Sequence, residues 1–141
     1  MRTEAIHAAI PHRDPFLFVD AVVEQSADAI TCRKTFTGEE HFFAGHYPEL
    51  PLVPGVILCE AAMQAGAILL SQHIDADGGV PVATRMNDVR FKRMVRPGET
   101  IDIEVTLTEQ LSGAFFMKAK VLVEGATAVR FEFACALAGS S

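Results

Sequence analysis

The sequence predicts an α+β fold in which one curved antiparallel sheet of about six strands wraps around a single long buried helix. Two observations predict this fold. Residues 52–70 are apolar almost throughout, and Pro54-Gly55 marks a helix start within them. Four long strand-like runs then follow between residues 82 and 137, separated by tight-turn signals that favour an antiparallel meander. A single sheet can bury such a helix only by curling around it, and a loop or a second subunit must cover the helix's far side.

Each element has its own signal in the chain. A short helix is expected over Thr3–Ile10, because Pro11 ends it. The long helix is expected from Gly55 to about His73. Apolar and β-branched runs predict strands over residues 16–24, 29–36, 82–94, 100–110, 114–124 and 126–137, with tight turns at residues 96–98, at 111–113 and at Gly125.

Residues 37–54 predict a long irregular loop, because glycines and prolines recur through them. Loops of this length in small domains are usually functional or disordered. The three aromatic residues of the loop, Phe42, Phe43 and Tyr47, are too many for a solvated linker. We therefore expect this loop to form part of the functional site.

Composition narrows the class of protein. The 141 residues fit one domain, 1–141, and a net charge of -6 argues against a general nucleic-acid binder. Cys32, Cys59 and Cys135 lack metal or disulfide spacing, which indicates reduced packing cysteines in the cytoplasm. The N-terminus has no signal-peptide pattern, and Glu60 with the short helix argues against a membrane span. The many apolar stretches indicate self-association.

Three features could carry chemistry. His46 lies in the Gly/Pro-rich loop, the amides of Gly55 and Val56 are free donors at a helix start, and Glu60 and Gln64 share one helix face. Taken singly, His46 could be a structural hydrogen bonder, and Gln64 could simply be the partner of Glu60. Together they supply a general base, a carboxyl whose pKa an apolar setting would raise, and an oxyanion site. Elimination of water from a 3-hydroxyacyl thioester requires these three groups.

Other sites are not predicted. His41 and His46 are not spaced as metal ligands, so no metal and no cofactor are expected. His7, His12 and His73 are interpreted as surface or capping residues.

Four segments in order resemble the bacterial 3-hydroxyacyl-[acyl-carrier-protein] dehydratases of the FabZ type. They are residues 10–20 (IPHRDPFLFVD), 43–48 (FAGHYP), 53–56 (VPGV) followed by Glu60 and Gln64, and 90–93 (RFKR) followed by 95–98 (VRPG). The resemblance spans nearly the whole chain.

The resemblance implies a hot-dog fold and a homodimer joined sheet edge to sheet edge, often assembled into a trimer of dimers. Each site would take His46 from one subunit and Glu60 from the other. His46 would remove the C2 proton, Glu60, held by Gln64, would help to expel the C3 hydroxyl, and the amide of Gly55, with that of Val56, would hold the thioester oxygen. The acyl chain would enter a tunnel along the helix. Glu60 in place of aspartate favours a dehydratase without isomerase activity.

The chain departs from the family pattern at three places: Asp14 replaces an aromatic residue, Tyr47 replaces phenylalanine, and residues 80–84 lack the usual aromatic gate of the tunnel. These departures put gating and chain-length preference in doubt. Two other functions stay open, a hot-dog acyl thioesterase and a non-catalytic acyl-binding paralogue, because fold alone does not separate them.

A cluster of positive charges suggests a partner. It consists of Arg85, Arg90, Lys92, Arg93 and Arg96, opposed only by Asp88. The last four of these cations are candidates for docking an acidic acyl carrier protein, or the phosphates of coenzyme A. The alternative interpretation is a charged strand edge that discourages aggregation. Neither a nucleic-acid nor a membrane partner is expected.

Overall fold

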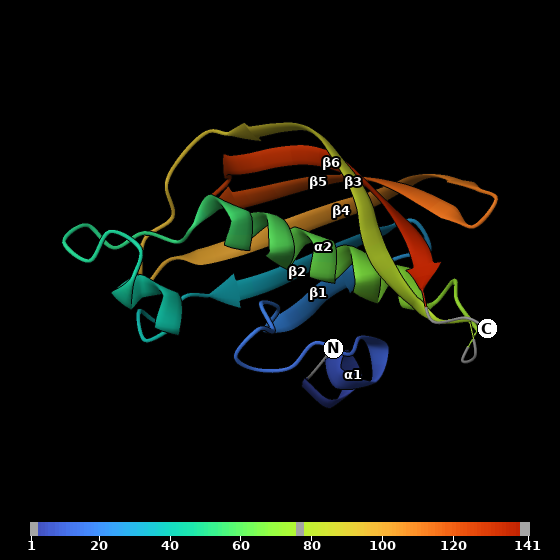
Figure 1. The fold of residues 1–141 in the computed structure, drawn as a ribbon, viewed down its shortest axis with the longest axis horizontal. Helices are drawn as coiled ribbons and strands as arrows, with labels where there is room; N and C mark the ends of the chain where they lie inside the picture. The colour runs from blue at the N-terminus through green and yellow to red at the C-terminus, as the bar shows by residue number, and fades with distance from the viewer. Residues whose placement is uncertain (1–2, 76–77, 139–141) are drawn as a thin grey trace.

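The computed structural model describes residues 3–75 and 78–138, in which a six-stranded antiparallel sheet curls around one long helix (Figure 1). The elements in chain order are α1 (Thr3–Ala9), β1 (Ala21–Gln25), β2 (Ala29–Thr35), the 3₁₀ helix η1 (His41–Ala44), α2 (Gly55–Ser71), β3 (Val80–Phe91), β4 (Thr100–Leu111), β5 (Ala114–Val123) and β6 (Ala126–Ala138). The predicted α+β class and the single long helix are confirmed.

The strand order β1-β2-β4-β5-β6-β3 corrects part of the predicted meander. β4, β5 and β6 are successive neighbours as expected, but the turn at residues 96–98 does not pair β3 with β4. Instead β3 pairs with β6, with Val80 opposite Ala138 at one end and Phe91 opposite Val129 at the other. The segment between β3 and β4 passes the start of α2, where the amide of Val53 donates to the carbonyl of Val95 at 2.7 Å. β3 therefore becomes an edge strand.

The predicted strand over residues 16–24 begins only at Ala21. The apolar pattern of residues 16–19 is that of a strand, but these residues form no ladder. The carbonyl of Phe16 and the amide of Phe18 are instead hydrogen-bonded to the side chain of Gln64 on α2. Phe18 itself is buried in the core, so the segment packs on the helix as an irregular strap.

The helix α2 is buried throughout its second half and partly open in its first half. Ala65 through Leu70 are all buried, and Gly66 approaches the sheet so closely that a Cβ there would lie 2.7 Å from the ring of Phe133. In the first half, Val56 is 71% exposed, and Glu60 and Met63 are partly exposed. Because these three positions lie on one helical face, the protomer leaves one stripe of the helix open, on the side that the sequence analysis expected a loop or a second subunit to cover.

The three cysteines are free and buried, as expected for packing residues. Burial raises the pKa of Cys32 to about 12, and those of Cys59 and Cys135 to about 11. The thiolates are therefore scarce near neutral pH, so none of the three is a reactive nucleophile. Within residues 3–75 and 78–138, no helix is both long and apolar enough to span a membrane.

Candidate active site

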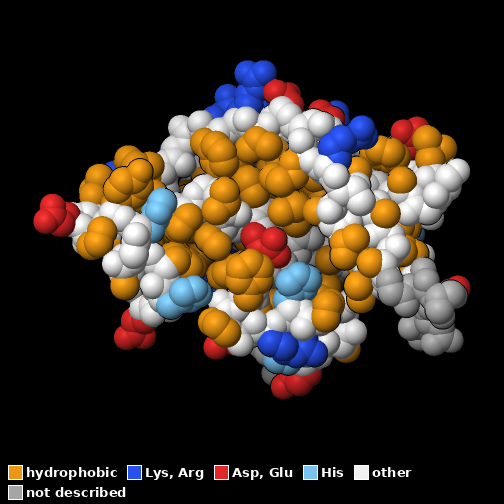
Figure 2. Space-filling view, viewed as in Figure 1, with side chains coloured by type: hydrophobic (Ala, Val, Ile, Leu, Met, Phe, Trp, Pro, Cys, Tyr) orange, Lys and Arg blue, Asp and Glu red, His pale blue; other side chains and the backbone are white. Residues whose placement is uncertain are grey.

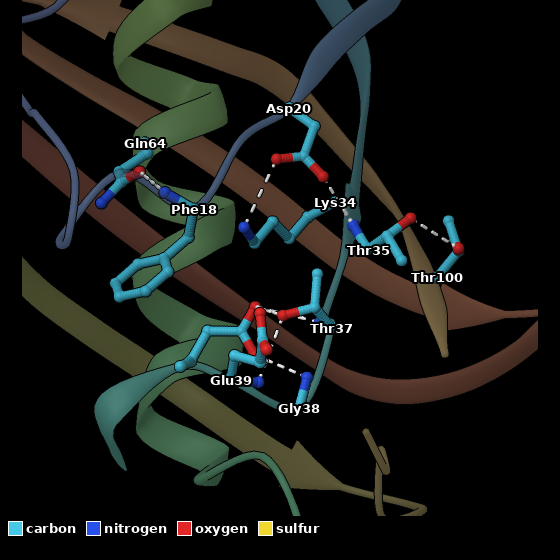
Figure 3. A network of polar contacts seen from close by, with 10 residues as sticks. Phe18, Asp20, Lys34, Thr35, Thr37, Gly38, Glu39, Gln64 and Thr100 are labelled. Atoms are coloured by element: carbon cyan, nitrogen blue, oxygen red, sulfur yellow. Dashed lines mark hydrogen bonds and ion pairs between the residues drawn. The ribbon is translucent and has the colours of Figure 1, made fainter. Parts of the chain in front are cut away.

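Gln64 is the buried polar centre of the site, with a residue exposure of 1%. Its Oε1 accepts a hydrogen bond from the amide of Phe18 at 2.7 Å. Its Nε2 donates to the carbonyl of Phe16 at 2.7 Å and to Oε2 of Glu60 at 3.0 Å. Figure 3 shows the Gln64 side chain directed from the helix toward Phe18. Gln64 is therefore more than a partner for Glu60, because it also ties the strap of residues 16–18 to α2.

Glu60 lies one helical turn before Gln64, and its side chain is 24% exposed. A histidine that the sequence interpretation placed at the surface lies beside it: Nε2 of His12 is 3.7 Å from Oε2 of Glu60. Figure 2 shows the same side of the molecule as Figure 1, with an acidic side chain amid a largely hydrophobic face and histidines nearby. Glu60 itself is thus partly exposed rather than enclosed within the protomer.

The start of α2 presents unpaired amides to a cleft. The N-cap carbonyl of Pro54 accepts from Ile57 and Leu58. Among the described residues the amides of Gly55 and Val56 have no acceptor, so both remain donors at the positive end of the helix. The cleft measures about 490 Å³ and is lined by Leu52, Val53, Gly55, Val56, Leu58, Phe91, Lys92, Arg93, Met94 and Val95.

Phe91 explains why the helix begins with glycine. A Cβ on Gly55 would lie 2.6 Å from Cε1 of Phe91, so only glycine lets the ring lie against the helix start. The Phe91 ring is itself 56% exposed. An aromatic residue therefore stands at this cleft, although the predicted gate region at residues 80–84 has none.

His46 lies on the loop between η1 and α2 and is only partly buried. Its ring contacts that of Tyr47, with centroids 4.7 Å apart, and Tyr47 adopts a positive φ of 53°. No hydrogen bond or ion pair joins His46 to Glu60 within the described part of the protomer. The structure thus joins Glu60 to Gln64 on α2, whose first residues line the cleft, and leaves His46 on an exposed loop.

Glu40 anchors the beginning of that loop. Its two carboxylate oxygens accept from the amides of Thr37 at 3.0 Å and Gly38 at 2.9 Å. Figure 3 shows this part of the network at Thr37 and Gly38. Partial burial alone would raise the pKa of Glu40, but these amide hydrogen bonds and the charge of Lys34 outweigh it, so the pKa lies below its ordinary value of 4.5.

Because the folded pKa of Glu40 is depressed, its stabilising contribution is present above the unfolded pKa and is lost as the pH falls through the folded value. We expect Glu40→Gln to lower the free energy of unfolding by about 1 kcal/mol at neutral pH. The difference from the parent chain should shrink toward zero in acid, as urea unfolding at several pH values would show. Glu39→Gln is the control, because Glu39 is exposed. A deficit that does not change with pH would contradict the carboxylate role.

The cationic cluster is partly engaged within the chain. Nε of Arg90 is 2.8 Å from Asp88, and Nη2 of Arg93 is 2.9 Å from Glu99. Lys92 and Arg96 are exposed, and neither has an ion pair among the described residues. Lys92 and Arg93 also line the cleft at the helix start. Free positive charge therefore stands at the entrance to the cleft.

His12 is the site residue that sequence reasoning missed. A single histidine near the N-terminus belongs to no helical or strand periodicity that would assign it to a site. The signal that could have found it is its place in the segment Pro11-His12-Arg13, shortly before the strap that bonds to Gln64. Across residues 3–75 and 78–138, no group of three or more His, Cys, Asp or Glu side chains is arranged to hold a metal ion.

The solved structures similar to this chain define its fold. The dehydratase heterocomplex ApeI:P from Xenorhabdus doucetiae matches with a TM-score of 0.80 at 18% identity, covering 95% of this chain and 91% of that one. The E. coli PaaI protein from the phenylacetic acid degradation operon matches with a TM-score of 0.67 at 16% identity, over 82% of this chain and 81% of that one. The curved sheet wrapped around α2 is the hot-dog fold.

The sequence comparisons are more specific. Residues 10–132 match the FabA-like domain family. The chain is 38% identical to the 3-hydroxyacyl-[acyl-carrier-protein] dehydratase FabZ of Clostridium perfringens over 137 residues, 97% of this chain and 99% of that one. It is 41% identical to the FabZ of Albidiferax ferrireducens over 132 residues, 91% of this chain and 88% of that one.

The fold and these sequence relatives define the chain as a hot-dog enzyme of the dehydratase class. It belongs to the FabA-like family and, within that family, to the FabZ-type 3-hydroxyacyl-[acyl-carrier-protein] dehydratases, lyases of fatty-acid biosynthesis.

Proposed function

We propose that this chain, in the cytoplasm, converts (3R)-3-hydroxyacyl thioesters carried on acyl carrier protein to trans-2-enoyl thioesters. His46 takes the C2 proton, and Glu60 gives a proton to the C3 hydroxyl, which leaves as water while the C2–C3 double bond forms. The amides of Gly55 and Val56 stabilise the negative charge that develops on the thioester oxygen. The observation that carries this proposal is the Gln64-anchored carboxyl of Glu60 on the open stripe of α2, near unpaired amides at the helix start.

We further propose that the site is completed by a second copy of the chain. Among the described residues of the protomer, no hydrogen bond or ion pair joins His46 to Glu60. β3 is an edge strand of twelve residues that exposes apolar side chains, with Val80, Val82 and Met86 each 40% exposed or more. Exposed strand edges tend to pair with another chain. A two-fold pairing of β3 with its copy joins the two sheets and supplies His46 of the partner subunit to Glu60. Such dimers are proposed to assemble further as a trimer of dimers.

Lys92 and Arg96, with Arg90 and Arg93, form the proposed docking surface for the carrier protein. Arg90 lies near the end of β3, and the other three lie in the segment that follows it. Lys92 and Arg93 also line the cleft at the helix start. Carrier proteins are acidic, so this surface would steer them toward the cleft by charge. Coenzyme A thioesters carry phosphates and would use the same cations.

An assay with a short 3-hydroxyacyl-carrier thioester tests the activity. Enoyl absorbance without release of free thiol is the expected result. Thiol release without enoyl product would identify a thioesterase instead, and neither product would identify an acyl-binding chain. Running the same assay with the coenzyme A thioester compares the two carriers, and the carrier protein is expected to give the higher kcat/KM.

Mixing two inactive variants tests the shared site. His46→Ala and Glu60→Gln chains, given different affinity tags and purified as a mixed dimer, should recover about half of the parent turnover per dimer, because one of the two symmetric sites is intact. Each variant alone should stay inactive. A verified mixed dimer with no recovery would show that His46 and Glu60 of one chain form the site.

A further inference from the structure

His12 is the feature of the site that the dehydration mechanism does not use. Its ring nitrogen Nδ1 is buried and has no hydrogen-bond partner among the described residues. Its other ring nitrogen, Nε2, faces Oε2 of Glu60 at 3.7 Å. A histidine with one nitrogen shut away from water and the other directed at the proposed acid calls for an explanation.

The backbone around His12 is fixed by its neighbours. The guanidinium of Arg13 donates to the carbonyls of Ile10 at 2.8 Å, His12 at 2.7 Å and His7 at 3.0 Å. Ile10 is buried in the core at 2% exposure, and the amide of Phe16 closes the following turn on the carbonyl of Arg13. The backbone of His12 is therefore held on both sides, and the ring extends from this fixed backbone toward Glu60.

The burial of Nδ1 indicates which tautomer the ring adopts. A proton on Nδ1 would be a buried donor with no acceptor, which is more costly than a bare lone pair there. We therefore assign the proton to Nε2, which then donates toward Oε2 of Glu60. The separation of 3.7 Å is longer than a hydrogen bond, and catalytic contacts of this kind commonly tighten when substrate binds.

The two contacts of Glu60 converge on one oxygen. Gln64 donates to Oε2 at 3.0 Å, and His12 approaches the same atom. Within the part of the chain that the structure describes, Oε1 has no partner. Because Oε2 accepts a hydrogen bond from Gln64 and faces a second nitrogen, it is the acceptor oxygen in this arrangement, and we assign the acidic proton to the other oxygen.

We propose that His12 is a positioning residue: together with Gln64 it fixes Oε2 of Glu60 as the anchored oxygen and presents Oε1–H to the C3 hydroxyl of the substrate. After Oε1 has given its proton to the departing water, the two donors on Oε2 stabilise the carboxylate that remains. This inference rests on the proposed role of Glu60 as the acid. His12 does not itself touch the reacting atoms.

Two conservative variants separate the donor at Nε2 from the shape of the ring. A glutamine at position 12 places an amide nitrogen near the position of Nε2, and an asparagine places one near Nδ1. We expect His12→Asn and His12→Leu to lower kcat by about 10- to 100-fold, as misplacement of a catalytic group does. His12→Gln should stay within about threefold of the parent kcat, and KM should change by less than about threefold in all three. His73→Gln, far along the chain at the other end of α2, is the control.

A double-mutant cycle makes the test specific to Glu60. In a Glu60→Gln background, His12→Leu should lower kcat no further than about twofold, because a positioning residue acts only through the group that it positions. An equal loss in both backgrounds would overturn the inference. So would a His12→Gln variant as impaired as His12→Asn, since the loss would then come from ring packing. Gel filtration and urea unfolding confirm that each variant is folded. If His12→Leu does not fold, the comparison of His12→Gln with His12→Asn still decides the test.

The cycle also separates the two hypotheses. If Glu60→Gln retains the parent kcat, the proposed acid is wrong and the role of His12 falls with it. If Glu60→Gln is inactive while His12→Asn and His12→Leu turn over normally, the acid stands and only the positioning role is overturned.

Discussion

Glu60→Gln is expected to lower kcat for dehydration by about 10²- to 10⁴-fold, the range that a general acid contributes. Glutamine keeps the shape of the side chain and can still accept from Nε2 of Gln64, but it has no proton to give to the leaving hydroxyl. The half-exposed position makes the change tolerable for folding, so the free energy of unfolding should change by less than about 1 kcal/mol. Steady-state kinetics on the carrier-linked substrate, with urea unfolding alongside, measure both quantities.

His46→Ala is expected to cause a loss of the same order, because it removes the proposed general base. Two matched controls keep these tests specific. Glu109→Gln changes an exposed glutamate on β4, and His41→Ala changes an exposed histidine at the start of η1, five residues before His46. Both should leave kcat close to the parent value. A Glu60→Gln or His46→Ala chain that turns over near the parent rate would remove that residue from the mechanism.

Gln64→Leu is expected to have the largest effect on stability, lowering the free energy of unfolding by about 2–5 kcal/mol. Leucine fits a helix and an apolar core, so neither propensity nor size explains such a loss. The cause is that the amide of Phe18 and the carbonyl of Phe16 lose the partner on α2 to which they are bonded at 2.7 Å. The Phe18 amide is buried and would be left without a partner at the full cost of its desolvation, and the partly buried Phe16 carbonyl would add to the loss.

The measurement is urea unfolding of the parent chain and of the Gln64→Leu variant, with Gln72→Leu as the control. Gln72 also donates a side-chain hydrogen bond, to the carbonyl of Ser26 at 2.8 Å, but it does so at the exposed surface. Its replacement should cost less than about 1 kcal/mol. Equal losses for the two variants would contradict the role of Gln64 in fastening the strap.

Local patterns predicted the elements that depend on neighbouring residues alone. The start of α2 at Gly55 and the strands β2, β4, β5 and β6 lie within one or two residues of their predicted bounds. Helical spacing also placed Glu60 and Gln64 on one face, and the structure confirms their contact. Periodicity determines these features because a side chain's direction follows from its place along a helix or strand.

The sequence by itself determined the α+β class with a curved sheet, the long helix and the polar pair upon it, while the hot-dog fold came from the family resemblance. Only the tertiary structure decided that β3 is an edge strand, that residues 16–18 bond to Gln64 instead of to a strand, and that His12 faces Glu60. The physical reason is that strand partners and side-chain contacts between distant segments depend on how the whole chain packs, and an apolar run looks the same whether a strand or a side-chain amide satisfies its backbone.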